Sequence, residues 1–153
     1  MRTIHVQTEL PTNAEQVWRA MRHPVSFTYV IRGLIGIPAL AGRTEPFQQD
    51  EVVTARLWLF HAVPAWRHRI HLVEVDPRTR TMRSRERGGL ITTWNHTLRV
   101  ESLGERRCRY SDIVEIGAGR ITPLVANIAL LLYRYRQRRW RRLVRHGLLP
   151  AAP

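Results

Sequence analysis

The sequence contains no lysine, so all of its 25 basic side chains are arginines, and only 12 residues are acidic. The resulting net charge of +13 would favour an approach to phosphate groups, on nucleic acid or on a membrane surface. The complete absence of lysine also indicates a bias in codon usage, which weakens a functional interpretation of the charge. Because the chain has no helix-turn-helix pattern, no RNA-binding signature and no aromatic residues interleaved for base stacking, we expect nucleic acid not to be its partner.

The chain has only one cysteine, and we expect neither a secretion signal nor a long apolar run. The single cysteine, Cys108, excludes an internal disulfide and lacks an activating motif, so we expect it to be a small core residue. The N-terminal residues have no apolar core of the kind that a secretion signal needs, and we therefore expect a cytoplasmic location. The longest apolar stretch, which begins near residue 121, is only about 13 residues long and is typical of a buried helix.

Signatures of metal and cofactor sites are also missing. No two histidines share a helix face at the spacing of metal ligands, and His61, His68 and His71 fall on predicted strands where alternation separates His68 from His71. The chain has no phosphate-binding glycine loop, no nucleophile elbow and no dinucleotide fingerprint. We therefore expect neither a metal nor a cofactor.

A chain of 153 residues that is 44% hydrophobic, without repeats or low-complexity segments, is the size of one ordinary domain. We expect this domain to cover residues 1–147 and residues 148–153 to form a short C-terminal tail.

Residues 121–146 are predicted to form one long terminal helix, capped by Thr122 with Pro123 at the first helical position, and ended by Gly147. Its apolar residues fall on one broad side of a helical wheel and most of its arginines on the other. Arg136 and Arg139 are the exceptions: they point into the apolar side and are candidate anion-binding groups. The apolar side comprises Leu124, Val125, Ile128, Leu131, Leu132, Tyr135, Trp140 and Leu143, and the basic side Arg134, Arg138, Arg141, Arg142 and Arg145.

The remaining elements follow from alternation, capping and turn residues. Alternation over residues 3–10 predicts a strand, and the spacing of Thr12 and Glu15 predicts a capping box that opens a helix to about residue 23. A second short helix is expected over residues 25–31, then a loop at 33–46, then strands at 48–61, 66–76, 79–87, 90–102 and 106–117. This order predicts an α+β fold in which a curved antiparallel sheet of about six strands wraps around the terminal helix.

The last two strands carry the sharpest chemical feature of the chain. Alternation places Trp94, His96 and Leu98 on the inner face of one strand, and Tyr110 and Asp112 on the inner face of the next. A hairpin loop with an odd number of residues would pair His96 with Asp112, Trp94 with Val114 and Leu98 with Tyr110. A histidine opposite a carboxylate can move protons as an acid–base pair. The pair is also explained by two polar residues that satisfy each other, or by Asp112 pairing with Arg136 or Arg139.

The order of these elements, with several local phrases, resembles the helix-grip fold of the SRPBCC superfamily, which includes START domains, the birch-pollen allergen and polyketide cyclases. The phrases lie at residues 11–18, 88–96, 110–114 and 133–136. The resemblance implies a deep apolar cavity between sheet and helix for lipids, polyketides or other hydrophobic molecules, and chemistry on them only in some members. A fold does not name a ligand.

Two classes of function remain open. The first is a binding or carrier protein for a small hydrophobic molecule (lipid-, polyketide- or isoprenoid-like), with a pocket of about several hundred Å³ between the sheet and residues 121–136. The second is an enzyme of the cyclase, aromatase or dehydratase type that uses His96 and Asp112. A weaker alternative docks the arginine-rich helix on an anionic membrane or RNA. The expected ligand-binding residues are Trp94, His96, Leu98, Tyr110, Asp112, Leu124, Ile128, Leu132 and Tyr135.

Overall fold

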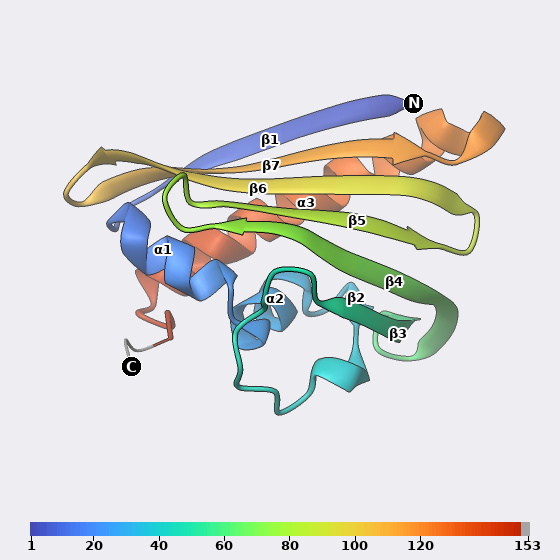
Figure 1. Ribbon diagram of the computed structural model, residues 1–153, viewed down its shortest axis with the longest axis horizontal. Helices are drawn as coiled ribbons and strands as arrows, with labels where there is room; N and C mark the ends of the chain where they lie inside the picture. The colour runs from blue at the N-terminus through green and yellow to red at the C-terminus, as the bar shows by residue number, and fades with distance from the viewer. Residues whose placement is uncertain (151–153) are drawn as a thin grey trace.

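An antiparallel sheet of seven strands, in the order β1-β7-β6-β5-β4-β3-β2, curls around one long helix in the computed structural model, which describes residues 1–150 (Figure 1). The first strand lies beside the last because β1 pairs with β7 over its whole length. The predicted α+β helix-grip architecture is confirmed. The elements are β1 (Arg2–Leu10), α1 (Ala14–Met21), α2 (Pro24–Ile31), β2 (Ile35–Gly36), η1 (Pro38–Leu40), β3 (Val52–Leu59), β4 (Val63–Asp76), β5 (Thr81–Gly88), β6 (Ile91–Gly104), β7 (Arg107–Gly117), η2 (Gly119–Ile121) and α3 (Thr122–Arg145).

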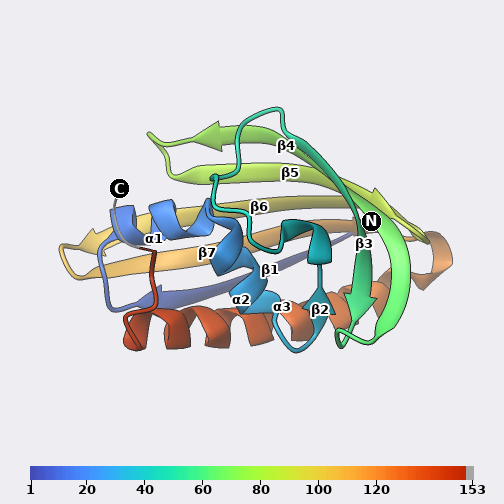
Figure 2. The ribbon, with the colours of Figure 1, turned by 90° about the horizontal axis from the view of Figure 1, so that it is seen from below.

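The strand count differs from the expected six because part of the predicted loop at 33–46 forms secondary structure. Ile35 and Gly36 pair with Leu59 and Trp58 at the edge of the sheet and form β2. The predicted strand at 48–61 is shorter than expected and begins only at Val52. Figure 2 shows α3 along one edge of the molecule, with the sheet curving over it and α1 and α2 on the concave side.

The first helix begins one residue later than a Thr12 cap would place it. Asn13 is the N-cap, and its side-chain oxygen accepts a hydrogen bond of 2.9 Å from the backbone N–H of Gln16. Thr12 instead bonds the Gln16 side chain. Asparagine caps a helix as well as threonine does, so the start was predicted within one residue although the capping side chain was wrong.

The predicted end of α3 is confirmed and its predicted cap is wrong. Gly147 adopts a φ of 62°, its N–H bonds the Val144 carbonyl at 3.1 Å, and the N–H of Leu148 bonds the Leu143 carbonyl at 3.0 Å. This pair of backbone hydrogen bonds is a Schellman motif, which favours glycine at the position with left-handed backbone angles. Thr122 lies within the helix instead of capping it: its hydroxyl accepts from the Ala118 N–H at 2.9 Å and donates to the Gly119 carbonyl at 2.7 Å.

The face that α3 presents to the sheet is narrower than the predicted apolar side. In its first half the buried residues are Thr122, Ala126, Ala129 and Tyr133, and the last three pack with Val114 and Ile116 of β7. Leu124 and Ile128 are 60% and 58% exposed. The small alanine side chains let the helix approach the sheet closely and turn the larger leucine and isoleucine outward.

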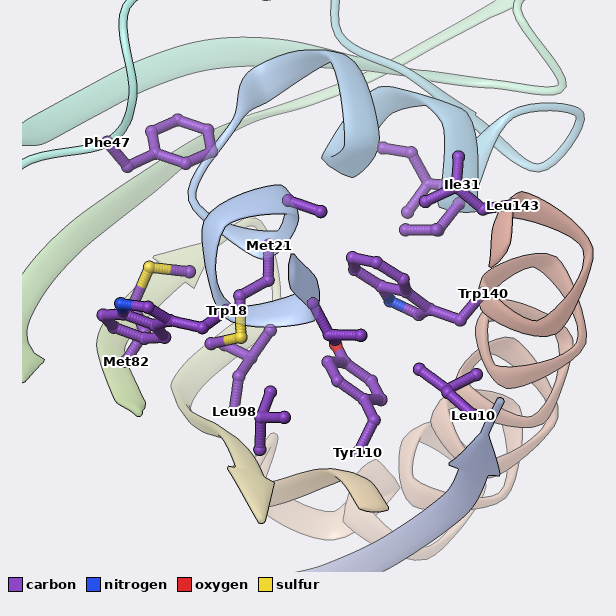
Figure 3. Packing of buried hydrophobic residues seen from close by; sticks show 14 of the residues in the cluster. Leu10, Trp18, Met21, Ile31, Phe47, Met82, Leu98, Tyr110, Trp140 and Leu143 are labelled. Atoms are coloured by element: carbon purple, nitrogen blue, oxygen red, sulfur yellow. The ribbon is translucent and has the colours of Figure 1, made fainter. Parts of the chain in front are cut away.

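The second half of α3 belongs to the main core. Trp140 and Leu143 are buried among side chains from β1, α1 and α2, as Figure 3 shows. The rings of Trp140 and Tyr110 lie 4.9 Å apart between centroids. The predicted role of Cys108 as a core residue agrees with its complete burial, which raises the pKa of its thiol to about 11.

No helix within residues 1–150 combines the length and the apolar composition that crossing a membrane requires. The expected cytoplasmic location stays a prediction, and so does the domain boundary at residue 147. Residues 151–153 of the predicted tail lie outside the described residues.

Candidate functional site

The inner face of the sheet carries the side chains that alternation predicted, but in a shifted register. His96 is paired with Val114, Trp94 with Ile116 and Leu98 with Asp112, so the predicted pairs were each wrong by two residues. A β-bulge between Ser102 and Gly104 and a short connection through residues 105–106 cause the shift. A shift of two keeps every side chain on its predicted face.

His96 and Asp112 nevertheless touch, as diagonal neighbours across the two strands. The Nε2 atom of His96 lies 2.8 Å from Oδ1 of Asp112, and both side chains are almost completely buried. Diagonal positions on an antiparallel sheet are within reach of long side chains. The predicted contact is therefore present although the predicted pairing is not.

Asp112 has no exposed surface and is surrounded by donors. Besides His96, the Tyr110 hydroxyl donates to Oδ1 at 3.1 Å and the Gln137 amide donates to Oδ2 at 2.7 Å. The guanidinium of Arg136 lies 3.8 Å from Oδ1 and supplies an opposite charge. Both oxygens of this carboxylate therefore accept hydrogen bonds from protein groups.

The charge of Asp112 is maintained by these partners. Burial alone would raise the pKa of Asp112, but the charge of Arg136 and the hydrogen bonds from His96 and Gln137 outweigh it and hold the pKa below its ordinary value. Burial raises the pKa of Tyr110 and Tyr133, so both phenols keep their protons and act as donors. The ion pair with Asp112 keeps Arg136 charged inside the protein.

His96 has a second contact on its other ring nitrogen. The Tyr133 hydroxyl lies 3.4 Å from Nδ1 of His96, with the two rings in an edge-to-face arrangement at 4.9 Å between centroids. The indole N–H of Trp94 donates to the same hydroxyl at 3.3 Å. Both nitrogens of His96 thus face protein groups, which fixes the orientation of the ring.

A second histidine–carboxylate pair lies on the neighbouring strands β4 and β5. His68 Nε2 lies 2.9 Å from Glu86 Oε2, and Ser84 donates to the other carboxylate oxygen. Burial would raise the pKa of Glu86, but the hydrogen bond from His68 and the nearby His96 outweigh burial and lower it. Ser84 of β5 lies directly opposite His96 of β6 in the sheet. The pairs His68–Glu86 and His96–Asp112 therefore form one polar row across β4, β5, β6 and β7.

The interior cavity beside this row is small. It encloses about 40 Å³, close to the share of a single water molecule. Ser84, Glu86, His96 and Arg136 form its polar end, and Nε of Arg136 has no hydrogen-bond partner within residues 1–150. Its apolar lining is Met21, Phe27, Val30, Leu40, Phe47, Val53, Ile70, Leu72, Met82, Leu98 and Trp140. This cavity is far smaller than the several hundred Å³ expected between the sheet and residues 121–136, because side chains of α1, α2 and the following loop occupy much of the space.

A much larger hollow, the outer pocket, lies between α2, β2, η1 and the end of β3. Its volume is about 620 Å³ and most of its lining is apolar. The lining residues are Val25, Thr28, Tyr29, Arg32, Ile35, Gly36, Ile37, Pro38, Ala41, Trp58 and His61. Its size falls within the range that is usual for small-molecule sites.

His61 is held in a fixed orientation at the wall of the outer pocket. Its Nε2 atom accepts a hydrogen bond of 3.0 Å from the backbone N–H of Gly33, so the neutral ring carries its proton on Nδ1. A Cβ atom at Gly36 would lie only 2.8 Å from that nitrogen, which means that the approach of His61 requires glycine at this position. His61 and Arg32 supply two of the hydrogen-bond donors of the pocket, beside Thr28, Tyr29 and Trp58.

The expected ligand-binding residues are dispersed. Only His96 and Leu98 line the interior cavity, while Trp94, Tyr110 and Asp112 lie in or beside the polar row. Leu124 and Ile128 point away from the interior, Leu132 is half-buried and lines neither pocket, and the Tyr135 hydroxyl donates to the Arg32 carbonyl. The expected placement of the α3 residues around a cavity was wrong. The first half of α3 is apolar nearly all round, so a helical-wheel projection does not indicate which face of it is buried.

Of the two arginines expected to point inward, Arg136 is 4% exposed and pairs with Asp112. Arg139 lies at the edge of the core, where its guanidinium stacks on the Tyr29 ring at 4.1 Å and donates to the Tyr29 carbonyl at 3.2 Å. Their role in binding an anion stays a prediction.

The sequence interpretation missed His68, Ser84 and Glu86. Alternation in β5 contained the signal: Arg83, Arg85 and Arg87 face outward, which places Met82, Ser84 and Glu86 on the inner face. Within residues 1–150, no group of three histidine, cysteine or acidic side chains is placed as metal ligands would be.

The model of a family described as a domain of unknown function, DUF8410, matches residues 8–146. The chain belongs to the DUF8410 family. No curated protein sequence matches it.

Solved structures share the fold of this DUF8410 protein at low sequence identity. Protein CV1439 from Chromobacterium violaceum has a TM-score of 0.71 and 16% identity, covering 93% of this chain and 96% of its own. A START superfamily protein from Mycobacterium smegmatis has a TM-score of 0.66 and 12% identity, with coverage of 94% and 97%. The Zhui aromatase/cyclase from a Streptomyces species has a TM-score of 0.59 and 16% identity, with coverage of 93% and 95%. The resemblance to the SRPBCC superfamily, predicted from the sequence, is confirmed at the level of the fold.

Proposed function

We propose that this DUF8410 protein binds a small, largely apolar molecule with one hydrogen-bond-accepting end, and that the molecule occupies the outer pocket. The observation that carries the proposal is the combination of a volume of about 620 Å³ with a lining that is mostly apolar. The interior cavity of about 40 Å³ is too small for such a molecule.

The polar groups of the outer pocket favour a ligand with an acceptor. Nδ1–H of His61 and the guanidinium of Arg32 both donate, and a carbonyl or carboxylate oxygen would satisfy them. Trp58 and Tyr29 offer aromatic surface for the apolar part. Among proteins of the same fold, one is named a START superfamily protein and another an aromatase/cyclase, which supports a role with small organic molecules.

The proposal can be tested with 8-anilinonaphthalene-1-sulfonate, an apolar fluorophore with an anionic end. Ala41→Trp should fill the outer pocket and lower the affinity for this probe about tenfold or more, because Ala41 lines the pocket and is itself exposed. Ala39→Trp is the matched control, since Ala39 is exposed, lies two positions away and does not line the pocket. Equal probe affinity in the two variants would contradict the proposal.

A second candidate is acid–base catalysis of the cyclase or dehydratase type by His96, positioned by Asp112. The observation that favours it is that His96 both lines the interior cavity and lies 2.8 Å from Asp112. A substrate would have to displace Phe47 or another wall residue to reach His96. Crystals grown with the host's own copurified small molecule would decide: a ligand atom within hydrogen-bond distance of His96 would support this candidate over the outer pocket.

A further inference from the structure

The outer face of α3 exposes a row of large apolar side chains. Ile121, just before the helix, and Leu124, Ile128 and Leu131 within it are between 40% and 66% exposed. Their spacing of three and four residues places them on one side of the helix. Figure 2 shows the sheet and the short helices to one side of α3, and the exposure of these four side chains indicates that the row lies on the side that the described chain leaves open.

The same row changes from apolar to basic along the helix. The spacing of three and four residues continues from Leu131 through Tyr135 to Arg138, Arg142 and Arg145. All three arginines are exposed, as are Arg134 and Arg141 beside them. Within residues 1–150 none of these five arginines has a carboxylate within ion-pair distance. The 24-residue helix contains seven arginines and no acidic residue.

We propose that this outer face of α3 docks the protein on an anionic lipid surface, with the apolar row entering the interface and the arginines contacting lipid phosphates. A helix of this length extends about 36 Å and would lie in the plane of the membrane. Apolar and cationic groups on one face are the combination that such interfacial helices use.

Other occupants fit the observations less well. The phosphates of duplex nucleic acid would pair with the arginines but would leave the apolar row exposed to water. A second copy of the chain could cover the apolar row, but it would bring another arginine-rich helix close to the first. Only the lipid surface complements both halves of the row.

Cosedimentation with vesicles tests the proposal and does not depend on the outer pocket. At about 0.15 M salt, the wild-type protein should bind vesicles of mixed phosphatidylcholine and phosphatidylserine and should not bind phosphatidylcholine alone. Leu124→Gln combined with Leu131→Gln should weaken binding about tenfold or more, because less apolar surface enters the interface. Since the two leucines are 60% and 66% exposed, this double variant should keep the unfolding midpoint of the wild type.

The contribution of the arginines in the second half of α3 can be measured against a control variant with the same change in charge. Arg138→Gln with Arg142→Gln should weaken vesicle binding about tenfold. Arg67→Gln with Arg85→Gln removes two exposed arginines from the outer face of β4 and β5 and should weaken it less than about threefold.

Three results would overturn the proposal. One is that the wild-type protein does not bind anionic vesicles. Another is that the Arg67 and Arg85 variant loses as much binding as the Arg138 and Arg142 variant, which would indicate attraction without a defined face. The third is that the leucine variant binds vesicles with the affinity of the wild type, while the wild type either binds duplex DNA or forms a dimer that the leucine variant does not form.

Discussion

The interior cavity and the outer pocket lie on opposite sides of α2 and η1, and they differ in what surrounds them. Val30 and Leu40 face the interior cavity, whose polar end is formed by Ser84, Glu86, His96 and Arg136. Tyr29, Ile37 and Ala41 face the outer pocket, which is about fifteen times larger in volume (620 against 40 Å³) and carries Arg32 and His61 in a mostly apolar wall. The same short segment thus fills one space and shapes the other.

This difference suggests separate tasks for the two regions. In the interior, buried charges are paired, which makes that region costly to disturb. In the outer pocket, Nδ1 of His61 and the guanidinium of Arg32 have no hydrogen-bond partner within residues 1–150, which makes that region suited to an external molecule. Mutations in the interior should therefore change the free energy of unfolding, whereas mutations in the outer pocket should change the binding of a probe.

The largest effect is expected from Asp112→Asn. The substitution keeps the shape but leaves Arg136 buried without a counter-charge, and breaking one partner of a buried ion pair costs about 3–5 kcal/mol. Urea denaturation followed by circular dichroism would measure the loss in the free energy of unfolding. A loss below about 1 kcal/mol would show that the polar row is not a structural centre.

Acidification should lower the stabilising contribution of the polar row. Because the folded-state pKa values of Asp112 and Glu86 are lowered, their stabilising contribution is fully present above the ordinary carboxyl values of 3.8 and 4.5 and is lost as pH falls through the folded-state values. Urea denaturation midpoints measured at a series of pH values from 7 downward should therefore decrease once the pH drops below about 4. Asp112→Asn should make this fall smaller, and an unchanged profile in the variant would assign the acid sensitivity to other carboxylates.

The two histidine–carboxylate pairs should respond unequally to loss of the imidazole. We expect His96→Gln to cost about 1–3 kcal/mol, because Asp112 is completely buried and loses a donor. His68→Gln should cost less, since Glu86 is 12% exposed and keeps its bond from Ser84. Both variants should keep wild-type affinity for 8-anilinonaphthalene-1-sulfonate. A strong loss of probe binding in His96→Gln would place the ligand in the interior.

The smallest effect is expected from Gly36→Ala. The added Cβ would meet His61 Nδ1 at 2.8 Å and push the ring away from the outer pocket. Probe affinity should fall about threefold to tenfold, or roughly 1 kcal/mol, while the unfolding midpoint changes little. Fluorescence titration would measure this change. An affinity equal to that of the wild type would remove His61 from the proposed contacts.

The elements that the sequence predicted well are those with a clear period. Alternation located β6 and β7 and the inner face of each, and a glycine located the end of α3 at Gly147. The contact between His96 and Asp112 could be predicted for the same reason, because the register differs from the expected one by two residues and such a shift keeps both side chains on the inner face.

Two features could not be predicted because they depend on packing. The register between β6 and β7 follows from the bulge near Ser102, which leaves no mark on the alternation before it. The inner face of α3 follows from the close fit of Ala126 and Ala129 on the sheet, whereas the apolar pattern alone favoured Leu124 and Ile128. The outer pocket arises mainly from α2 and residues 35–41, and the second of these segments has no hydrophobic period.

A crystal structure of the protein with bound 8-anilinonaphthalene-1-sulfonate would show whether a small molecule occupies the outer pocket and not the interior. We expect electron density for the probe between Tyr29 and Trp58, with its sulfonate near His61 or Arg32. Density for the probe between Phe47 and His96, with the interior cavity opened to receive it, would rule out the outer pocket as the binding site.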